Sequence, residues 1–393
     1  MYCADAGAVP LQLDGVTSYV GDNPLVAAAI AVAVVVLLVV LFFGFRRFTQ
    51  TGGQRFARLL GRHDRVAVLM HPNPDPDAMS AALAVGAIAD YTDTEASLHY
   101  PGQIRHQENR AFETVLDLDF DRVESSADLP DVPVVLVDHN EPRGFSGAEG
   151  VDPFAVVDHH PGGGEGSAFT DVRTDNGACA SIFAEYFEEM GLKPIDPEEL
   201  ATVEDTEDVI DPRVATGLLY GIQSDTKSLT KGCSSAEFEA SAFLYPGVDE
   251  DRLDRIANPE VDAEVLDIKA TAITSRDVRN AFAVSDVGTV SNVDAIPQAA
   301  DELLRLEGVT AVVVFGDKDG TIHLSGRSRD DRVHMGKSLR AVVEDVPMAG
   351  AGGHARMGGG QLSIEHMEGI GPSQGLSREE FTDRLFETLA GDR

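Results

Sequence analysis

The chain has 393 residues and a formal net charge of −35 at pH 7, from 66 acidic and 31 basic residues. Its length allows two globular domains with additional segments, and its three cysteines are too few and too scattered for a disulfide framework or a cysteine-based zinc site. Only six of the basic residues are Lys, and the acidic residues are spread along the whole chain. This balance favours a protein kept soluble in high salt, as in a halophile, and it does not exclude nucleotide substrates.

An apolar segment near the N-terminus predicts a single membrane-spanning helix. Residues 25–45 carry no charged side chain and are long enough to cross a bilayer. Arg46 and Arg47 follow directly, whereas the preceding residues contain no Lys or Arg, so we expect the bulk of the chain in the cytoplasm, anchored at the cell membrane. A cleaved signal peptide is the alternative, but the acidic start argues against it. We expect an extracytoplasmic tail at 1–23, the transmembrane helix at 24–45 and a juxtamembrane linker at 46–62.

The rest of the chain predicts two α/β domains. From residue 63, short apolar runs alternate with helical patterns, which is typical of a domain with a parallel sheet, and we assign it residues 63–247. Its expected helices cover 78–89, 178–190 and 214–223, with an exposed acidic loop at 195–211. A helical connector is expected at 248–280 and a smaller α/β domain at 281–393, with a strand at 281–284, a helix at 297–307 and a strand pair at 309–315 and 321–325.

Acidic and histidine residues follow three of the predicted strands. The apolar runs 66–70, 134–137 and 154–157 are typical of buried strands in a parallel sheet. Because the carboxyl ends of such strands form the ligand crevice, we expect the residues that follow them to converge. These residues are His71, Asp75, Asp77, Asp138, Asp158, His159 and His160, and Asp225 after the helix at 214–223 is a further candidate.

Carboxylates and imidazoles in this number suit two divalent metal ions. Two ions about 3.5–4 Å apart clamp the attacking and leaving oxygens of a phosphoryl displacement. The ligand mixture is harder than that of a zinc site and softer than that of a magnesium site, which favours Mn²⁺. Each cluster alone is also compatible with a solvated turn or a helix N-cap, but three clusters at three strand ends disfavour that interpretation.

A glycine-rich run near the C-terminus has two interpretations. Residues 350–360 form either a flexible loop or a segment whose backbone amides approach an anion, with His354 embedded among the glycines. Arg327 follows a strand of the same domain and is a candidate phosphate clamp. The remaining histidines are expected at the surface or in satisfied positions, without a role: His63, His99, His106, His139, His323, His334 and His366.

Taken together, these motifs resemble the DHH/DHHA1 phosphoesterase family. Asp158-His159-His160 is the triplet that gives the family its name, and the segment from His71 to Ala78 matches the family's first motif. Asp138 and Asp225 stand where the second and fourth motifs place an Asp, and Gly352-Gly353-His354 matches the glycine-histidine motif of the C-terminal lobe. The resemblance covers roughly residues 63–393, in the expected order.

The resemblance implies a role for each candidate residue. One Mn²⁺ would be held by His71, Asp75 and Asp138, and the other by Asp77, Asp138, His159 and Asp225. His160 would face the scissile phosphate, with Asp158 orienting its neighbours, while Arg327, Gly352, Gly353 and His354 would bind the far side of the substrate. The implied reaction hydrolyses short oligonucleotides, dinucleotides or 3'-phosphoadenosine 5'-phosphate (pAp) to nucleoside monophosphates, using water activated by both metals.

Two alternatives stay open. A cyclic di-AMP phosphodiesterase in second-messenger signalling fits the membrane anchor, although anchored members usually carry sensory domains for which residues 46–62 leave no room. A non-catalytic, membrane-tethered nucleotide sensor is the alternative from another class, and the complete set of expected metal ligands disfavours it. No long duplex nucleic acid is expected as a partner, and the anchor permits a homodimer.

Overall fold

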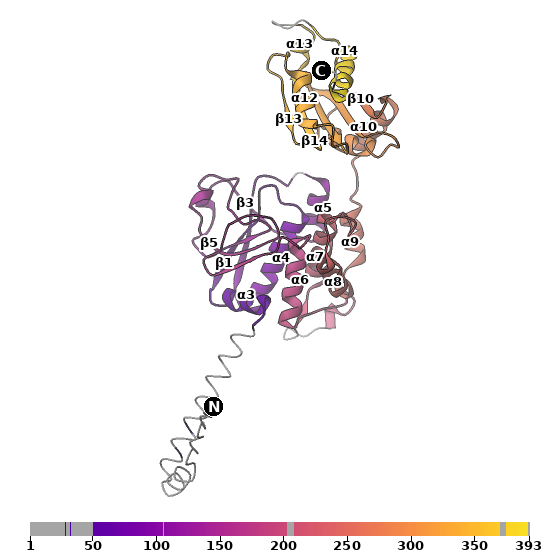
Figure 1. Cartoon of the computed structure of the whole chain (residues 1–393). Helices are drawn as coiled ribbons and strands as arrows, with labels where there is room; N and C mark the ends of the chain where they lie inside the picture. The colour runs from indigo at the N-terminus through magenta and orange to yellow at the C-terminus, as the bar shows by residue number, and fades with distance from the viewer. Residues whose placement is uncertain are drawn as a thin grey trace, which may run out of the picture. The chain divides into compact units, whose positions relative to one another are not determined.

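The computed structural model describes residues 28, 32, 50–104, 106–202, 208–369 and 375–391. The chain divides into two compact units, Met1–Pro259 and Glu260–Arg393 (Figure 1). The membrane-spanning helix expected at residues 24–45 lies outside the described residues, apart from Ala28 and Val32. Within the described part of the chain, no helix has the length and apolar character needed to span a membrane.

The N-terminal unit is built on a six-stranded parallel sheet with the strand order β3-β2-β1-β4-β5-β6. The three predicted apolar runs are its neighbouring strands β1, β4 and β5, so the prediction of a parallel sheet is confirmed. Their carboxyl ends therefore lie side by side at one edge. The strands are β1 Arg65–Leu69, β2 Glu95–Pro101, β3 Asp121–Val123, β4 Val134–Val137, β5 Pro153–Asp158 and β6 Phe169–Val172.

Both faces of this sheet are buried, which explains why its strands are continuous apolar runs. Val66 and Val68 of β1 point into the larger core, where α4, α6 and α7 pack on one face (Figure 1). Ala67 and Leu69 point into a smaller apolar cluster covered by irregular segments. The helices of this unit are α3 Gly52–Leu60, α4 Pro76–Tyr91, α5 Gln107–Val115, α6 Cys179–Met190, α7 Pro212–Asp225, α8 Ser235–Leu244 and α9 Glu250–Ala257.

The segment at 46–62, expected as a short juxtamembrane helix or linker, contains the packed helix α3. Phe56 and Leu60 of α3 are fully buried in the core, because their i, i+4 spacing forms an apolar stripe on one face of the helix. Gly53 lies so close to α6 that an added Cβ would be 2.6 Å from Tyr186 Cα. Residues 50–62 are thus part of the N-terminal unit rather than a free spacer. The expected connector at 248–280 is likewise divided, with α9 in the first unit and α10 Ala263–Thr274 in the second.

The C-terminal unit is a six-stranded mixed sheet in the order β13-β14-β12-β11-β10-β9. Only β10 and β11 pair in parallel; the other neighbours are antiparallel. The expected hairpin is formed by β11 and β12, with Asp319 and Gly320 both at positive φ in its two-residue turn. The strands are β9 Asp277–Arg279, β10 Phe282–Thr289, β11 Ala311–Lys318, β12 Thr321–Ser328, β13 Gly350–Gly353 and β14 Met357–Ser363. The other helices are α11 Ala295–Leu303, α12 Met335–Val343, α13 Ile364–Met367 and α14 Arg378–Ala390.

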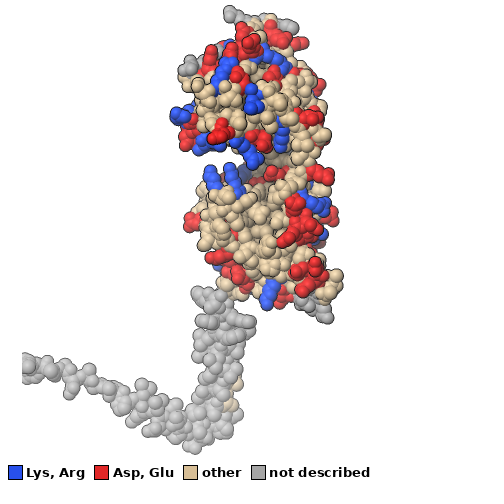
Figure 2. Space-filling model, turned by 90° about the vertical axis from the view of Figure 1, so that its right-hand side faces the viewer, with Lys and Arg blue, Asp and Glu red and all other residues tan. Residues whose placement is uncertain are grey.

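On the face shown in Figure 2, each unit carries acidic side chains interspersed with Lys and Arg. Several arginines are each paired with two carboxylates, as Arg378 is with Asp286 and Asp317. Such pairing uses one cation for two carboxylates, in keeping with a chain of 66 acidic and 31 basic residues.

Candidate metal centre

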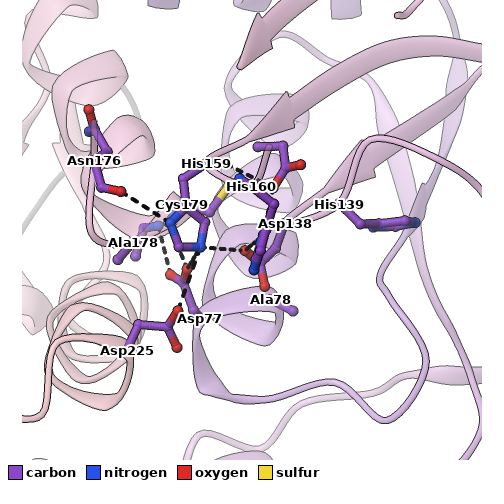
Figure 3. Close-up of polar contacts among 12 residues, drawn as sticks. Asp77, Ala78, Asp138, His139, His159, His160, Asn176, Ala178, Cys179 and Asp225 are labelled. Atoms are coloured by element: carbon purple, nitrogen blue, oxygen red, sulfur yellow. Dashed lines mark hydrogen bonds and ion pairs between the residues drawn. The ribbon is translucent and has the colours of Figure 1, made fainter. Parts of the chain in front are cut away.

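Seven carboxylate and imidazole side chains converge at the carboxyl ends of β1, β4 and β5. Figure 3 shows five of them: Asp77, Asp138, His159, His160 and Asp225. The seven side chains form three groups, and within each group the possible ligand atoms lie within 4.8 Å of one another. The groups are His71 with Asp75 and Asp138; Asp77 with His159 and Asp225; and Asp138 with His159 and His160. All six residues expected as metal ligands are therefore brought together in one place.

Asp138 lies at the centre of the cluster, directly after β4. Its Oδ2 is 3.3 Å from His71 Nε2, and its Oδ1 is 3.2 Å from His159 Nε2. The side chain is 1% exposed, and its backbone has a φ of 60°, a left-handed conformation that Asp and Asn tolerate better than other side chains. The two oxygens of one buried carboxylate thus face two different imidazoles, which is the geometry of a bridging ligand.

Backbone carbonyls orient both imidazoles. His71 Nδ1 is 3.0 Å from the Pro72 carbonyl oxygen, and His159 Nδ1 is 3.2 Å from that of Asn176. Because a carbonyl only accepts hydrogen bonds, Nδ1 is the protonated nitrogen in each ring, and we assign the tautomer on that ground. The Nε2 atoms are then the ones directed at the carboxylates, and the Nδ1 hydrogen bonds are of the outer-shell kind that orient metal-ligating histidines.

Asp75 and Asp77 combine a role in the fold with a place in the cluster. Asp75 is the N-cap of α4, with Oδ1 accepting a hydrogen bond from Ala78 N at 3.1 Å, while its Oδ2 faces His71 Nε2 at 3.7 Å. Asp77 is fully buried and accepts hydrogen bonds from the first two amides of α6, Cys179 N at 2.6 Å and Ala180 N at 2.8 Å. The N-cap interpretation therefore holds for Asp75, but one oxygen remains for the cluster.

The crowding of like charges strongly perturbs the ionisation of these groups. Burial raises the pKa of Asp77, and the charges of Asp138 and Asp225 raise it further. Burial also raises the pKa of Asp225, to about 7, together with the charges of Asp75 and Asp138. Burial alone would lower the pKa values of the two histidines, but neighbouring carboxylates raise that of His71 to about 11 and that of His159 to about 10. Protons on the imidazoles thus offset the excess negative charge.

Two buried atoms of the cluster indicate that it fits metal ions. Asp138 Oδ1 and His159 Nε2 form no hydrogen bond with any described residue, although they lie 3.2 Å apart. A buried polar atom without a partner is costly, and both of these atoms are good ligands for a divalent cation. The set of four carboxylates that face two imidazoles suits a divalent transition-metal ion better than a purely oxygen-binding ion.

Asp158 and His160 form a hydrogen-bonded pair beside the cluster. Asp158 is fully buried, and its Oδ1 accepts hydrogen bonds from His159 N at 2.8 Å, His160 N at 3.0 Å and His160 Nδ1 at 3.0 Å. The hydrogen bond to Asp158 raises the pKa of His160 above its ordinary value. Half of the His160 side chain is exposed, so its Nε2 is free to contact a ligand.

Three residues of this region were not predicted as site residues. Asn176 contacts His159 through its main-chain oxygen, which every residue type has, so the sequence could not indicate this contact. Asn140, two residues after Asp138, hydrogen bonds to Asp158. His139 is 1% exposed rather than at the surface, and its Nε2 has no hydrogen-bond partner in the described part of the chain. Burial lowers the pKa of His139 to about 4, so its ring is neutral at pH 7.

The candidate substrate-binding residues lie in the C-terminal unit. Arg327 on β12 is paired with Asp301 of α11, with Nε 2.7 Å from Oδ1 and Nη2 3.3 Å from Oδ2, so its guanidinium already has a bidentate partner. The glycine-rich run is a β-hairpin of β13 and β14 and not the flexible loop that was one of its two interpretations. His354 is exposed in the turn, and its amide donates to the Met357 carbonyl at 2.8 Å.

Close packing accounts for part of the glycine run. An added Cβ on Gly353 would lie 2.4 Å from Met357 O, and one on Gly336 of α12 would lie 2.2 Å from Gly353 O. Gly352 has more room, since a Cβ there would meet only Arg340 Nη2, at 3.5 Å. Arg340 of α12 is exposed and forms no ion pair with a described residue, so its guanidinium is more available than that of Arg327 to bind a phosphate.

Residues 65–222 match the DHH family, N-terminal domain, and residues 279–370 match the DHHA1 domain. An uncharacterized protein of Methanocaldococcus jannaschii is 31% identical over 82% of this chain and 63% of its own length. The cyclic-di-AMP phosphodiesterase GdpP of Geobacillus thermodenitrificans is 27% identical over 78% of this chain and 46% of its own length. The chain thus spans less than two thirds of the length of these curated relatives.

A solved structure has a similar fold. The exopolyphosphatase-related protein from Bacteroides fragilis matches with a TM-score of 0.55, covering 86% of this chain and 96% of that one. The two sequences are 15% identical, so the similarity is one of fold.

Proposed function

The chain carries a DHH domain followed by a DHHA1 domain, and from this premise we propose that it is a Mn²⁺-dependent phosphoesterase acting on small nucleotides. The observation that carries the proposal is Asp138, whose two buried oxygens face His71 and His159 at 3.3 and 3.2 Å. The phosphodiesterase GdpP aligns with 78% of the chain, which supports hydrolysis of a phosphodiester bond.

The residues of the cluster have two roles in the proposed reaction, metal binding and phosphate binding. His71, Asp75 and Asp138 would hold one divalent ion, and Asp77, Asp138, His159 and Asp225 the other. When bound, such a pair supplies positive charge to the reacting phosphate and lowers the pKa of water. Asp158 holds His160 Nδ1, which leaves Nε2 of this half-exposed side chain to donate a hydrogen bond to a phosphate oxygen.

The substrate class is the finer part of the proposal. We infer short oligonucleotides, linear dinucleotides or pAp as substrates and nucleoside monophosphates as products. Cyclic di-AMP is the second candidate, favoured by the alignment with GdpP. In the C-terminal unit, Gly352, Gly353 and His354 would contact the far side of the substrate. Arg340 would supply a positive charge there, because the guanidinium of Arg327 is already paired with Asp301.

A substrate panel tests this proposal. The fragment from residue 50 retains α3, and it would be incubated with Mn²⁺ in high KCl with cyclic di-AMP, the dinucleotide pApA, a short RNA or pAp, followed by chromatography of the products. Conversion of pApA, short RNA or pAp to monophosphates is the expected result, and rapid conversion of cyclic di-AMP would favour the second candidate. Nucleotide binding without turnover of any substrate would refute the enzyme in favour of a sensor.

We also propose that the protein is held at the cell membrane, with both catalytic units in the cytoplasm. The support is the uncharged apolar sequence at residues 25–45 followed by Arg46 and Arg47. After cell lysis and an alkaline carbonate wash, the full chain should sediment with membranes and a chain starting at residue 50 should not. Equal release of both into the supernatant would contradict this location.

A further inference from the structure

Asn140 contacts both halves of the Asp158–His160 pair through a single amide nitrogen. It follows β4 by three residues and is 8% exposed. Its Nδ2 donates a hydrogen bond to Asp158 Oδ2 at 2.6 Å and a second, longer one to the His160 carbonyl at 3.2 Å. One side chain therefore fixes the carboxylate that holds the His160 ring and the backbone that carries this ring.

The hydrogen bond to Asp158 determines the orientation of the carboxylate. Oδ1 of Asp158 accepts three hydrogen bonds from His159 and His160, whereas Asn140 is the only hydrogen-bond partner of Oδ2 among the described residues. Without Asn140, this fully buried oxygen would be unpaired, which is unfavourable. Rotation of the carboxylate to regain a partner would move Oδ1 away from His160 Nδ1.

A glycine loop after His160 makes room for Asn140. An added Cβ on Gly162 would lie 2.1 Å from Asn140 Oδ1, and one on Gly164 would lie 1.7 Å from the Asn140 carbonyl oxygen. A Cβ on Gly163, between them, would meet no heavy atom within 4 Å. None of the three has a positive φ, so their backbone conformation does not require glycine. Close contact therefore favours glycine at both positions, at 162 with the Asn140 side-chain amide and at 164 with the backbone carbonyl of the same residue.

We infer that Asn140, seated by Gly162 and Gly164, is a positioning residue that holds Asp158 and aims His160 at the substrate. This inference rests on the proposed function, because the role of His160 is that of a phosphate-facing group. Asn140 itself is 8% exposed, and its two hydrogen bonds go to Asp158 and His160 and to none of the six residues that would hold the metal ions.

Substitutions of Asn140 separate hydrogen bonding from space filling. In the full chain, Asn140→Ala should lower kcat about 10- to 100-fold, with KM within about threefold of wild type. Asn140→Asp keeps the size but loses the donor and places a carboxylate against Asp158, so it should be at least as damaging. A kcat near that of wild type in either variant would show that the hydrogen bonds of Asn140 are not needed, and the inference would be wrong.

Two neighbouring glycines supply a matched pair of variants. Gly162→Ala should displace the Asn140 amide without removing it and reproduce the loss of kcat, whereas Gly163→Ala should match wild type because its methyl group meets nothing. Equal activity of these two variants would overturn the inference. So would a loss of kcat that is fully explained by a lower melting temperature.

Two readouts do not depend on turnover. Mn²⁺ affinity, measured by calorimetry, should stay within about threefold of wild type in Asn140→Ala, because Asn140 donates its hydrogen bonds to Asp158 and His160 and not to the six expected metal ligands. A crystal structure of this variant should show the Asp158 carboxylate rotated and the His160 ring displaced, and an unchanged ring would refute the inference. If wild type turns over no substrate while the ring does move, the proposed function fails and the positioning role remains.

Discussion

At the scale of single residues, the carboxylates of this site differ in how far their oxygens are held by hydrogen bonds of the fold. Asp75 uses Oδ1 to cap α4 and Oδ2 to face His71, and Asp77 is held at both oxygens by the first amides of α6. Asp138 differs because its carboxylate accepts no such hydrogen bond from a helix amide in the described part of the chain, and both of its oxygens face imidazoles. A change at Asp138 should therefore affect the chemistry more than the fold.

The variant Asp138→Asn tests the bridging role. Asn is nearly isosteric and tolerates the left-handed backbone at this position, so the fold should persist. The loss of one anionic bridge should lower activity by more than about 100-fold and reduce the number of tightly bound Mn²⁺ ions from two to at most one. Activity assays and calorimetry would measure both, with Asp152→Asn as a control at an exposed carboxylate. Full activity with two bound ions would exclude a bridge.

The pH dependence of metal binding follows from the two histidines. With pKa values of about 11 for His71 and about 10 for His159, both rings are protonated at pH 7 in the metal-free protein. Each must lose its proton to become a ligand, so Mn²⁺ affinity should rise with pH, by up to about tenfold per pH unit for each proton released. Calorimetry in Pipes and in Tris, which differ in ionisation enthalpy, should give different apparent binding enthalpies. Identical enthalpies would show that no proton is released.

At the scale of elements, the sequence predicted the parts of the site that depend on local pattern. Continuous apolar runs identify β1, β4 and β5, and the residues that follow them converge because the strands are adjacent and parallel. The pairing of Arg327 with Asp301 was not predictable, because it depends on how α11 packs against β12, and the two residues are 26 positions apart. The Gly353 contact with Gly336 is likewise a property of tertiary packing.

One buried carboxylate on α8 supports the site from a distance. Glu237 is fully buried and accepts hydrogen bonds from Ser234 N at 2.6 Å, Gly177 N at 2.8 Å and Ser181 Oγ at 2.8 Å. Gly177 follows Asn176, whose carbonyl orients His159. Burial alone would raise the pKa of Glu237, but these hydrogen bonds lower it below its ordinary value.

The variant Glu237→Gln should destabilise the fold by about 1–3 kcal/mol at pH 7, since an amide cannot accept at both atoms. Because the folded-state pKa is lowered, the contribution of Glu237 is present at pH values above the unfolded-state pKa and is lost as the pH falls through the folded-state value. The variant should thus approach wild type in acid. Denaturant unfolding at pH 7 and pH 4 would measure this, with the exposed Glu239→Gln as control. A constant difference at both pH values would contradict the assignment.

At the scale of the whole molecule, charge sets the conditions under which the fold is stable. The net charge of −35 is spread over both units, so repulsion between carboxylates opposes folding at low ionic strength. Surface ion pairs such as that of Arg378 are weakened by salt, but each contributes only about 0–1 kcal/mol. Because carboxylates outnumber cations, the relief of repulsion should outweigh the loss of these pairs.

Salt should therefore stabilise the protein, and screening predicts the form of the dependence. The Debye length falls from about 10 Å at 0.1 M to about 3 Å at 1 M, so most of the gain from screening should appear below about 1 M KCl. Thermal unfolding across a KCl series should show a steep rise in melting temperature that then flattens. Sucrose, which is excluded from protein surfaces but does not screen charge, should give a gradual rise instead. A melting temperature that falls or stays constant as KCl increases would mean that the ion pairs, rather than the excess carboxylates, dominate the electrostatics of this fold.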